Sequence, residues 1–449
     1  MNKKRIDMLN GSLWDKILKF ALPLALTGIL QQLFNAADVA VVGRCVNSDA
    51  MAAVGSNTPV IGLLINLFVG ISLGTNVVIA NAIGGNDEKT VKSAVHTSVL
   101  VAFTGGILIC IAGEIISKPM LELLGVPPEV FPMALAYLRV YMIGMPVILL
   151  YNFESAIYRS AGDTKTPLIT LVISGIINVV LNLFFVMVLK MTADGVAAAT
   201  VISNFISAMI LFFGLVRTNL PIKVEIKRLR IDTTVLKRIL RIGVPAGVQS
   251  MTFSAANLVI QSAINSLGNI VMAGSSAAFN LEVFAYFILN SFGQACTTFV
   301  GQNNGANKPE RCRRALMICL LEDFLFTMAA IVMILLFGKD LLWLFNKDNA
   351  VIEAGYVRLI YIFGAYTFSL ISDVLSGYLR GYGISFFPAI ISLVGICGVR
   401  IIWIATVFQQ NRTFENIMIT YPISLGITAA VIGAYVLISR PDKKEAVKK

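Results

Sequence analysis

Two observations predict an all-α integral membrane protein with twelve transmembrane helices in two parallel-repeat six-helix lobes. Hydrophobic residues make up 57% of the 449 residues and charged residues only 14%, and the apolar stretches are longer than a core helix needs. A helix needs about 20 apolar residues to cross roughly 30 Å of hydrocarbon, whereas a β-barrel would show alternation. The second observation is a duplication, because the motif Arg-x-x-Gly-x4-Pro from Arg159 to Pro167 recurs from Arg380 to Pro388 at a shift of 221 residues.

The duplication extends beyond this motif. At a shift of 222 residues, Pro23 and Asn35 fall on Pro245 and Asn257. Six spans per half is an even number, so both halves enter the membrane from the same side and the repeats are related by an axis along the membrane normal. Repeats of this kind predict a central cleft between two bundles, and they commonly work by alternating access.

The first six spans are separated by charged or turn-forming residues. Arg44 follows the first span, Gly84-Gly85-Asn86-Asp87 the second, Pro127-Pro128 the third, the Arg159–Pro167 loop the fourth and Lys190 the fifth. The expected spans cover 14–41, 52–80, 93–117, 133–157, 167–189 and 194–216. Residues 1–216 therefore form the predicted N-terminal six-helix lobe.

The second six spans follow a basic segment, 217–235, which we expect to be a cytoplasmic linker. Asn303-Asn304-Gly305 and Asn346-Lys347-Asp348-Asn349 separate spans in this half, as do the Arg380–Pro388 loop and Arg412. The expected spans cover 236–263, 271–299, 314–338, 354–379, 385–408 and 415–439. They define a C-terminal six-helix lobe over 236–440, and a cytoplasmic tail over 441–449.

The distribution of lysine and arginine predicts the orientation, because cytoplasmic segments retain positive charge. With the N-terminus inside, the outer loops carry only six of the 36 Lys and Arg residues, namely Arg44, Lys118, Lys190, Lys339, Lys347 and Arg412. The N-terminus lacks the apolar core and cleavage site of a signal peptide. We therefore expect a multi-pass protein of the cell inner (plasma) membrane with both termini cytoplasmic.

Composition argues against several other classes of protein. The net charge of +11 is spread over the loops of one membrane side, so nucleic-acid binding is not expected. The six cysteines form no Cys-x-x-Cys pair, and the single histidine, His96, lies near the inner start of a span. Without a P-loop, a catalytic triad or a metal motif, we expect no enzyme, no metal site and no cofactor.

Asp38 is the most informative polar residue within a span, because a charge near the bilayer centre costs roughly 2.5 to 3.5 kcal/mol on an insertion scale. It lies six residues before Arg44, hence about 9 Å below the outer end of the first span. Asn35 and Gln31, three and seven residues earlier, project on the same side and extend a polar stripe.

Three further polar residues are predicted to lie near the depth of Asp38. Asn182 precedes Lys190 by eight residues and Thr200 follows Asp194 by six, which places both about 9 to 12 Å below the outer surface. Asn178 lies one turn below Asn182. Their oxygens suit sodium, and a proton is equally possible, because burial favours the protonated form of a carboxyl group. The alternative is that these residues only join neighbouring helices.

Glu282 and Asp373 are further candidates. Glu282 lies near mid-membrane in the eighth span, where it suits a cleft-facing carboxylate that meets a cationic substrate or a coupling ion. Its alternative is an ion pair, with Arg400 of the eleventh span as the expected partner at similar depth. Asp373, seven residues before Arg380, is nearer the inner side and carries the same two interpretations.

Several motifs together resemble the multidrug and toxic compound extrusion (MATE) transporters. They are Asp38-x-x-x-Val42-Gly43-Arg44 followed by Met51-Ala52-Ala53-Val54-Gly55, the loop from Arg159 to Pro167, and Val300-Gly301-Gln302-Asn303-Asn304-Gly305-Ala306. The resemblance spans the whole chain. It implies a twelve-helix efflux antiporter that exports small organic, often cationic, compounds in exchange for H+ or Na+.

The resemblance also implies roles for individual residues. In that family the first-span aspartate, here Asp38, belongs to the cation site of the N-terminal lobe, and the matching positions are Asn178, Asn182 and Thr200. Some branches have an aspartate followed by proline where this chain has Asn182-Leu183, so a relay that needs two carboxylates is in doubt. The seventh span also lacks the acidic residue that another branch uses for sodium.

The partners expected are small organic substrates and the lipid bilayer, with the protein as a monomer. The alternative function is a flippase for a lipid-linked saccharide or related amphiphile, which should show a strongly basic cavity. A receptor or enzyme would need a soluble sensor domain or a catalytic cluster, and neither is present in the sequence. Without a nucleotide-binding motif, the energy for transport should come from an ion gradient.

Overall fold

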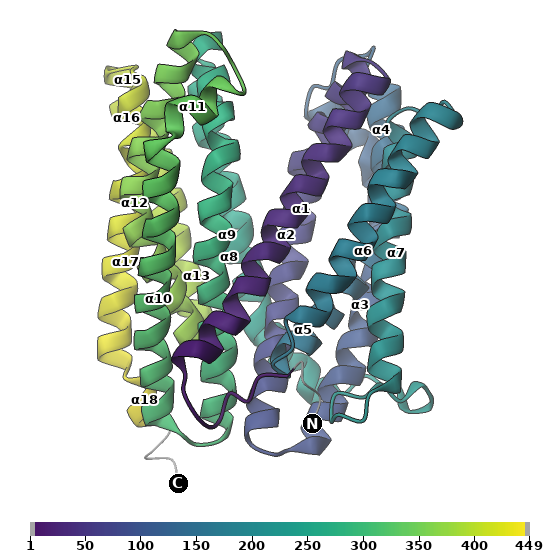
Figure 1. The fold of residues 1–449 in the computed structure, drawn as a ribbon, viewed down its shortest axis with the longest axis vertical. Coiled ribbons are helices and arrows are strands. Elements are labelled where there is room, and N and C mark those ends of the chain that lie inside the picture. Colours follow the sequence, from purple (N-terminus) through teal and green to yellow (C-terminus); the bar gives the residue numbers. More distant parts are fainter. Residues whose placement is uncertain (1–4, 445–449) are drawn as a thin grey trace. The chain divides into compact units, whose positions relative to one another are not determined.

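The computed structural model describes residues 5–444, and every regular element in this range is helical (Figure 1). The first half of the chain contains α1 (Trp14–Cys45), α2 (Ser48–Gly84), α3 (Glu88–Leu123), α4 (Phe131–Ile143), α5 (Met145–Ser160), α6 (Lys165–Leu183), the π-helix η1 (Phe184–Val188) and α7 (Ala193–Arg217). The short helix η2 (Ile226–Arg228) lies in the predicted linker.

The second half contains helices in the same order of long spans. They are α8 (Thr233–Asn265), α9 (Asn269–Gly305), α10 (Pro309–Leu336), α11 (Gly338–Trp343), α12 (Asn349–Gly381), α13 (Phe386–Ser392), the π-helix η3 (Leu393–Gly398), α14 (Val399–Ala405), α15 (Val407–Gln410), α16 (Phe414–Met418), α17 (Thr420–Ser439) and α18 (Pro441–Lys444). Each of the twelve predicted spans is helical, and the helices extend beyond most of the predicted ends.

Ten helical segments within residues 5–444 are long and apolar enough to cross a membrane. An eleventh span forms if α4 and α5 are taken together, with a bend of 49° between them. Gly144 and Pro146 explain this bend: proline has no N–H to donate, and a Cβ at Gly144 would lie 2.3 Å from Cγ2 of Val201. The twelfth predicted span lies in α8, which is 33 residues long but interrupted by polar residues such as Gln249 and Asn257.

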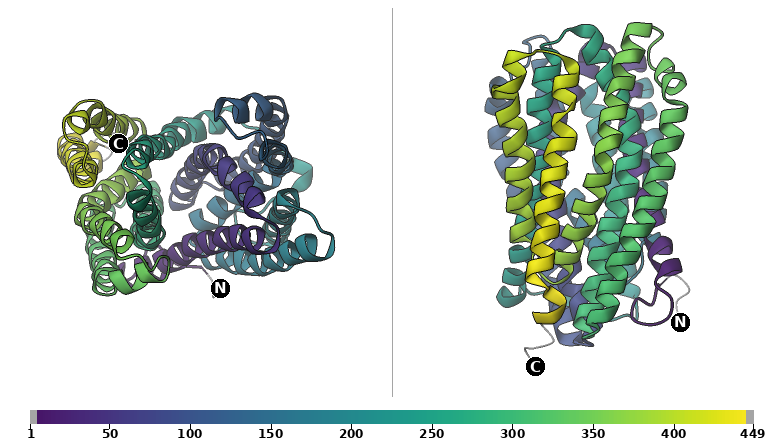
Figure 2. Two further views of the ribbon diagram at one scale, coloured as in Figure 1. Left: turned by 90° about the horizontal axis from the view of Figure 1, so that it is seen from above. Right: turned by 90° about the vertical axis from the view of Figure 1, so that its left-hand side faces the viewer.

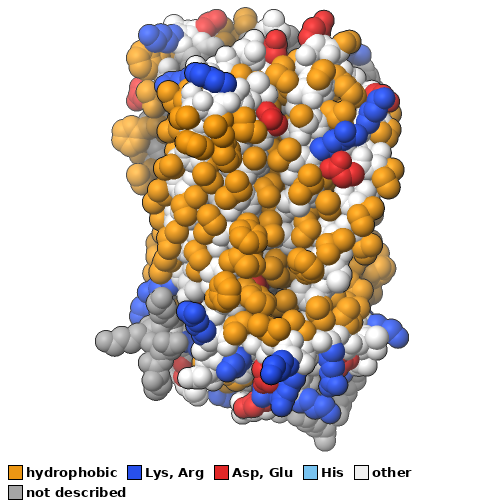
Figure 3. Space-filling view, turned by 90° about the vertical axis from the view of Figure 1, so that its right-hand side faces the viewer, with side chains coloured by type: hydrophobic (Ala, Val, Ile, Leu, Met, Phe, Trp, Pro, Cys, Tyr) orange, Lys and Arg blue, Asp and Glu red, His pale blue; other side chains and the backbone are white. Residues whose placement is uncertain are grey.

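The surface of the protein fits a membrane environment. On the face in Figure 3, hydrophobic side chains cover a broad central band, while charged side chains gather toward the two ends. Large apolar residues of α6 and α7 are exposed, among them Ile176, Val180 and Phe213. Apolar side chains on the outside of long helices are stable in contact with lipid and costly in contact with water.

The chain divides into two compact units. The N-terminal unit consists of Leu26–Ile83, Asp87–Gly243 and the described residues through Ile6. The C-terminal unit consists of Asp7–Ala25, Gly84–Asn86 and the described residues from Val244 onward. Because the boundaries cut α1 and α8, each of these two helices contributes to both units. Figure 2 shows the long helices of the C-terminal unit side by side, where α12 packs against α9, α10 and α17.

Polar contacts fix the start of the chain within the C-terminal unit. Nδ2 of Asn303 donates to the carbonyl oxygen of Met8 at 3.1 Å, and Nζ of Lys308 donates to that of Leu9 at 2.9 Å. Phe20 packs edge-on against Phe299, with ring centroids 5.7 Å apart. The first part of α1 therefore belongs to the same packed body as α9.

The predicted linker is bound to α3 within the N-terminal unit. Nε2 of His96 accepts a hydrogen bond from the backbone N–H of Glu225 at 3.0 Å, and the hydroxyl of Thr97 accepts one from the N–H of Asp232 at 3.0 Å. Close to this region a Cβ at Gly243 would lie 2.6 Å from Cα of Ile71, so the backbones of α8 and α2 touch there. The linker is thus an ordered part of the N-terminal unit.

Candidate functional site

Asp38 lies in a polar cluster formed by α1, α6 and α7 of the N-terminal unit. Its side chain is only 7% exposed. Oδ1 accepts a hydrogen bond from Nδ2 of Asn182 at 2.5 Å, and Oδ2 accepts one from the hydroxyl of Thr200 at 3.2 Å. Asn178 completes the cluster, because its Oδ1 accepts from Nδ2 of Asn182 at 3.2 Å and its Nδ2 donates to Thr200 at 3.4 Å. The structure brings together all four residues predicted for the cation site.

Local sequence explains how these side chains meet. Asn178 and Asn182 are four residues apart and therefore lie on the same face of α6. A Cβ at Gly175, one turn earlier, would lie 1.9 Å from Cε2 of Phe34, so glycine is needed for α1 and α6 to approach each other. The π-helix η1 begins two residues after Asn182, and such π-bulges are frequent at functional sites.

The cluster provides oxygen ligands and only one formal charge. Oδ1 of Asn182 is buried without a hydrogen-bond partner, although its Nδ2 is used twice. A buried acceptor without a donor is costly, and either a cation or the O–H of a protonated carboxyl group would satisfy it. No group of three or more His, Cys, Asp or Glu residues that could hold a metal ion occurs within residues 5–444. One carboxylate with neutral oxygens fits a proton or a monovalent cation.

Two residues near Asp38 were missed by the sequence analysis. Tyr137 and Tyr141 of α4 are nearly buried, stack with ring centroids 6.1 Å apart, and interact electrostatically with the Asp38 carboxylate. Their spacing of four residues in the fourth span was the only signal available, and it is common in membrane helices. They provide a rigid aromatic wall beside the carboxylate.

Gln31 and Asn35, the other predicted members of the polar stripe, lie outside this cluster. Both side chains are exposed on α1, one and two turns before Asp38. Their predicted position on the same side of α1 remains compatible with a role in meeting substrate. They do not contribute to the hydrogen bonds that hold the Asp38 carboxylate.

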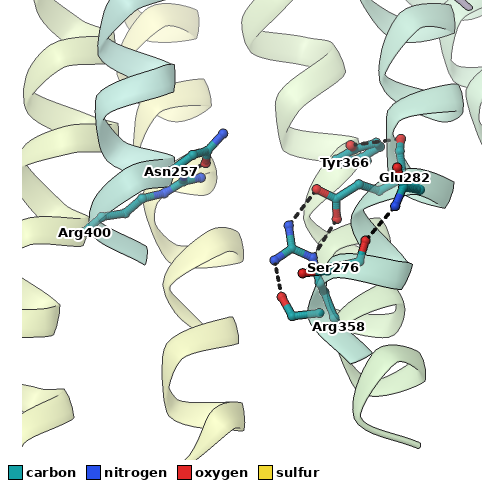
Figure 4. A network of polar contacts seen from close by, with 8 residues as sticks. Asn257, Ser276, Glu282, Arg358, Tyr366 and Arg400 are labelled. Carbon is teal, nitrogen blue, oxygen red and sulfur yellow. Dashed lines mark hydrogen bonds and ion pairs between the residues drawn. The ribbon is translucent and has the colours of Figure 1, made fainter. Parts of the chain in front are cut away.

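Glu282 forms a buried ion pair in the C-terminal unit, and the expected partner was wrong. Its Oε1 accepts from Nη2 of Arg358 at 2.7 Å and its Oε2 accepts from Nε at 3.0 Å (Figure 4). Arg358, not Arg400, is therefore the partner. Arg358 is nine residues after the start of α12 and Glu282 thirteen after the start of α9, a depth difference of about 6 Å by helical rise, which a long arginine side chain can span.

Arg400 is held by neutral groups. Nη1 donates to Oδ1 of Asn257 at 3.1 Å and Nε donates to the hydroxyl of Ser424 at 3.2 Å. The guanidinium carbon lies 4.2 Å from the ring centroid of Tyr421, in a cation–π contact. Arg400 is only 2% exposed, and no carboxylate within residues 5–444 lies within ion-pair distance of it.

Asp373 lies in a second polar group of the C-terminal unit. It accepts a hydrogen bond from Asn290 and interacts electrostatically with Arg380, which lies two turns later on α12. Nη2 of Arg380 donates to Oε1 of Gln249 at 3.2 Å. Asp373 is thus partly neutralised by a cation on its own helix, which favours a structural role and leaves a functional role as a prediction.

Comparison with known proteins identifies the family of the chain. The MatE family model matches twice, over residues 23–184 and 245–406, and the two matches begin 222 residues apart. The chain belongs to the MatE family. The double match confirms the duplication of the chain, and the helices of both halves confirm the all-α fold class with twelve helices in two lobes. The predicted resemblance to MATE transporters is also confirmed.

Relatives of this MatE protein cover nearly its whole length. It is 27% identical over 433 residues to "Probable multidrug resistance protein YoeA" of Bacillus subtilis, covering 94% of this chain and 93% of that one. It is 29% identical over 398 residues to "Probable multidrug resistance protein NorM" of Thermotoga maritima, covering 86% and 84%. A crystal structure of MATE in the bent conformation superimposes with a TM-score of 0.91 at 22% identity, covering 99% of this chain and 100% of that one.

Proposed function

We propose that this MatE protein is a secondary active multidrug efflux antiporter, which exports organic, often cationic, compounds in exchange for H+ or Na+ by alternating access. The names of its relatives support multidrug resistance as the role. The Asp38 cluster is the observation that carries the ion coupling, because it holds a buried carboxylate with no cationic partner. A carboxylate in this state gains stability when a proton or a sodium ion binds.

Ion binding at this cluster changes the packing of α1. The hydrogen bonds from Asn182 and Thr200 join Asp38 to α6 and α7. A bound cation needs the same carboxylate oxygens, so these hydrogen bonds must be released or rearranged. Moving one charge through 100 mV supplies about 2.3 kcal/mol, which is enough to bias such a rearrangement.

Transport in proteoliposomes tests the proposal. Efflux of a cationic rhodamine methyl ester is measured with a sodium gradient and a pH gradient imposed separately. We expect one of the two gradients to drive efflux, and Asp38→Asn to reduce it at least about fivefold, since coupling free energies correspond to roughly 5- to 150-fold effects. Asp340→Asn, which removes the same charge from an exposed side chain, is the control. Efflux by Asp38→Asn that equals the wild-type rate would sink the proposal.

The flippase alternative receives less support from the buried residues. Among residues 5–444, five acidic side chains and two arginines are buried, namely Asp38, Glu154, Glu282, Glu322, Asp323, Arg358 and Arg400. A site for an anionic lipid-linked saccharide would favour the opposite balance. The excess of buried acids fits the export of cationic compounds better.

A further inference from the structure

The buried charges of Glu282, Arg358 and Arg400 in the C-terminal unit do not cancel. The two-point ion pair neutralises Glu282 and Arg358, and Nη1 of Arg358 also donates to the hydroxyl of Ser275 at 2.8 Å (Figure 4). Arg400 retains its charge, because the guanidinium group stays protonated in proteins. The cluster therefore carries one positive charge that is not matched by a carboxylate.

The neutral contacts of Arg400 leave part of the guanidinium group unused. Asn257 and Ser424 engage Nη1 and Nε, and the ring of Tyr421 covers one face. The structure shows no hydrogen bond from Nη2 to another described residue. A buried cation held only by neutral dipoles costs free energy, and an anionic group would offset that cost.

The face beside Arg400 contains polar groups that lipid would not tolerate. Asn257 is exposed midway along α8, and Ser276 and Asn280 are exposed on α9, four residues apart on one face. Asn290 and Gln294 continue that face toward the other end of α9. Exposed amides in the middle of membrane spans face water, so a soluble molecule can reach Asn257 and the guanidinium group that it contacts.

We propose that Arg400 and Asn257 bind the anionic group of a transported compound, so that zwitterionic organic molecules carrying a carboxylate are substrates. Nη2 of Arg400 donates to the carboxylate, and the amide of Asn257 rotates to donate as well. The inference rests on the proposed export function and names a substrate class for it. Aromatic side chains nearby, Tyr421 and the exposed Phe279, supply surfaces for a ring system.

Binding of a matched pair of dyes to the full-length protein in lipid nanodiscs tests this proposal. The probes are a rhodamine with a free carboxyl group and its methyl ester, measured by fluorescence anisotropy. We expect Arg400→Gln to weaken binding of the free acid about tenfold and binding of the ester less than twofold, as fits the loss of one charge-assisted contact. Arg412→Gln, which removes an exposed arginine of the same unit, should change neither.

A second variant keeps the test valid if Arg400→Gln does not fold. Asn257→Asp is nearly isosteric and places a carboxylate within 3.1 Å of Nη1, so it should block the free acid without removing Arg400. Chloride that competes with the free acid in the wild type, but not in Arg400→Gln, would assign an inorganic anion to the same site.

The outcomes separate this inference from the proposed function. If both dyes bind and neither variant changes their relative affinity, the anionic site is overturned while the export function stands. If the wild-type protein binds neither dye, export of such organic compounds is itself contradicted and the inference fails with it.

Discussion

The two polar clusters of this protein solve the problem of a buried carboxylate in opposite ways. Asp38 in the N-terminal unit is held only by Asn182 and Thr200, so its charge is not neutralised. Glu282 in the C-terminal unit is neutralised by a two-point contact with Arg358. The first arrangement can take up a cation with little rearrangement of charge, whereas the second is complete without one.

The duplicated sequence makes this comparison informative. At the repeat shift, Asp38 corresponds to Ile260, which is 1% exposed within the apolar core of the C-terminal unit. The shared scaffold therefore does not dictate the polar site. Each unit has acquired its charged residues at positions where the other unit is apolar, and the chemistry of the two units is separable by mutation.

The largest effect that sharpens the comparison is expected for Glu282→Gln. This change leaves the buried guanidinium of Arg358 unpaired, which should cost about 3 to 5 kcal/mol of unfolding free energy. Asp38→Asn has no counter-charge to strand and should change the unfolding free energy by less than about 1 kcal/mol. Thermal unfolding in detergent of both variants measures the difference.

A double variant checks the cause of that loss. Glu282→Leu combined with Arg358→Met removes both charges and should recover most of the stability, since apolar replacement of a buried ion pair is often neutral. Equal stability of Glu282→Gln and Asp38→Asn would contradict the contrast between the two clusters.

An intermediate effect is expected for Gly175→Val, which tests the packing that supports Asp38. A Cβ at this position would lie 1.9 Å from the ring of Phe34, so α1 and α6 must separate, at a cost of about 1 to 3 kcal/mol. We expect lower unfolding temperature and weaker ion-driven efflux. Phe34→Ala in the same chain should restore both. Gly364→Val, at a position with no neighbour within 4 Å, is the control from the C-terminal unit.

The smallest effect concerns the inner ends of the two units. Asp87 caps α3, where its carboxylate accepts from the hydroxyl of Thr90 at 2.5 Å and from the N–H of Thr90 at 3.0 Å. At the repeat shift, Lys308 begins α10 without a side-chain cap. Asp87→Ala should therefore cost about 1 kcal/mol, and Lys308→Ala should not remove a cap.

The capping contribution of Asp87 should also depend on pH. The hydrogen bonds from the Thr90 hydroxyl and backbone hold the pKa of Asp87 below its usual value. A carboxyl group whose pKa is lower in the folded state stabilises above its unfolded pKa of about 3.9 and loses this effect as pH falls through the folded pKa. The difference between wild type and Asp87→Ala should narrow between about pH 5 and pH 3 in thermal unfolding. Asp87→Asn, which caps without titrating, should show no such narrowing.

Sequence alone predicted the spans and the members of the Asp38 cluster, because both follow from the fixed rise of a helix. Depth along a helix can be counted from the loop residues, and Asp38, Asn182 and Thr200 fall at one depth on that count. The partner of Glu282 could not be found in this way. Depth favoured Arg400, but the rotation of α12 about its axis and the length of the arginine side chain bring Arg358 to Glu282.

The division of α1 and α8 between the two units has a mechanical consequence. Each helix passes from one unit to the other within two residues of a proline, Pro23 in α1 and Pro245 in α8, and these prolines match in the duplicated sequence. Because proline leaves one backbone hydrogen bond unmade, bending stiffness is lowest at these points. The duplication has thus placed a flexure in each connecting helix at the same position, so that either unit can tilt without its own packing being strained.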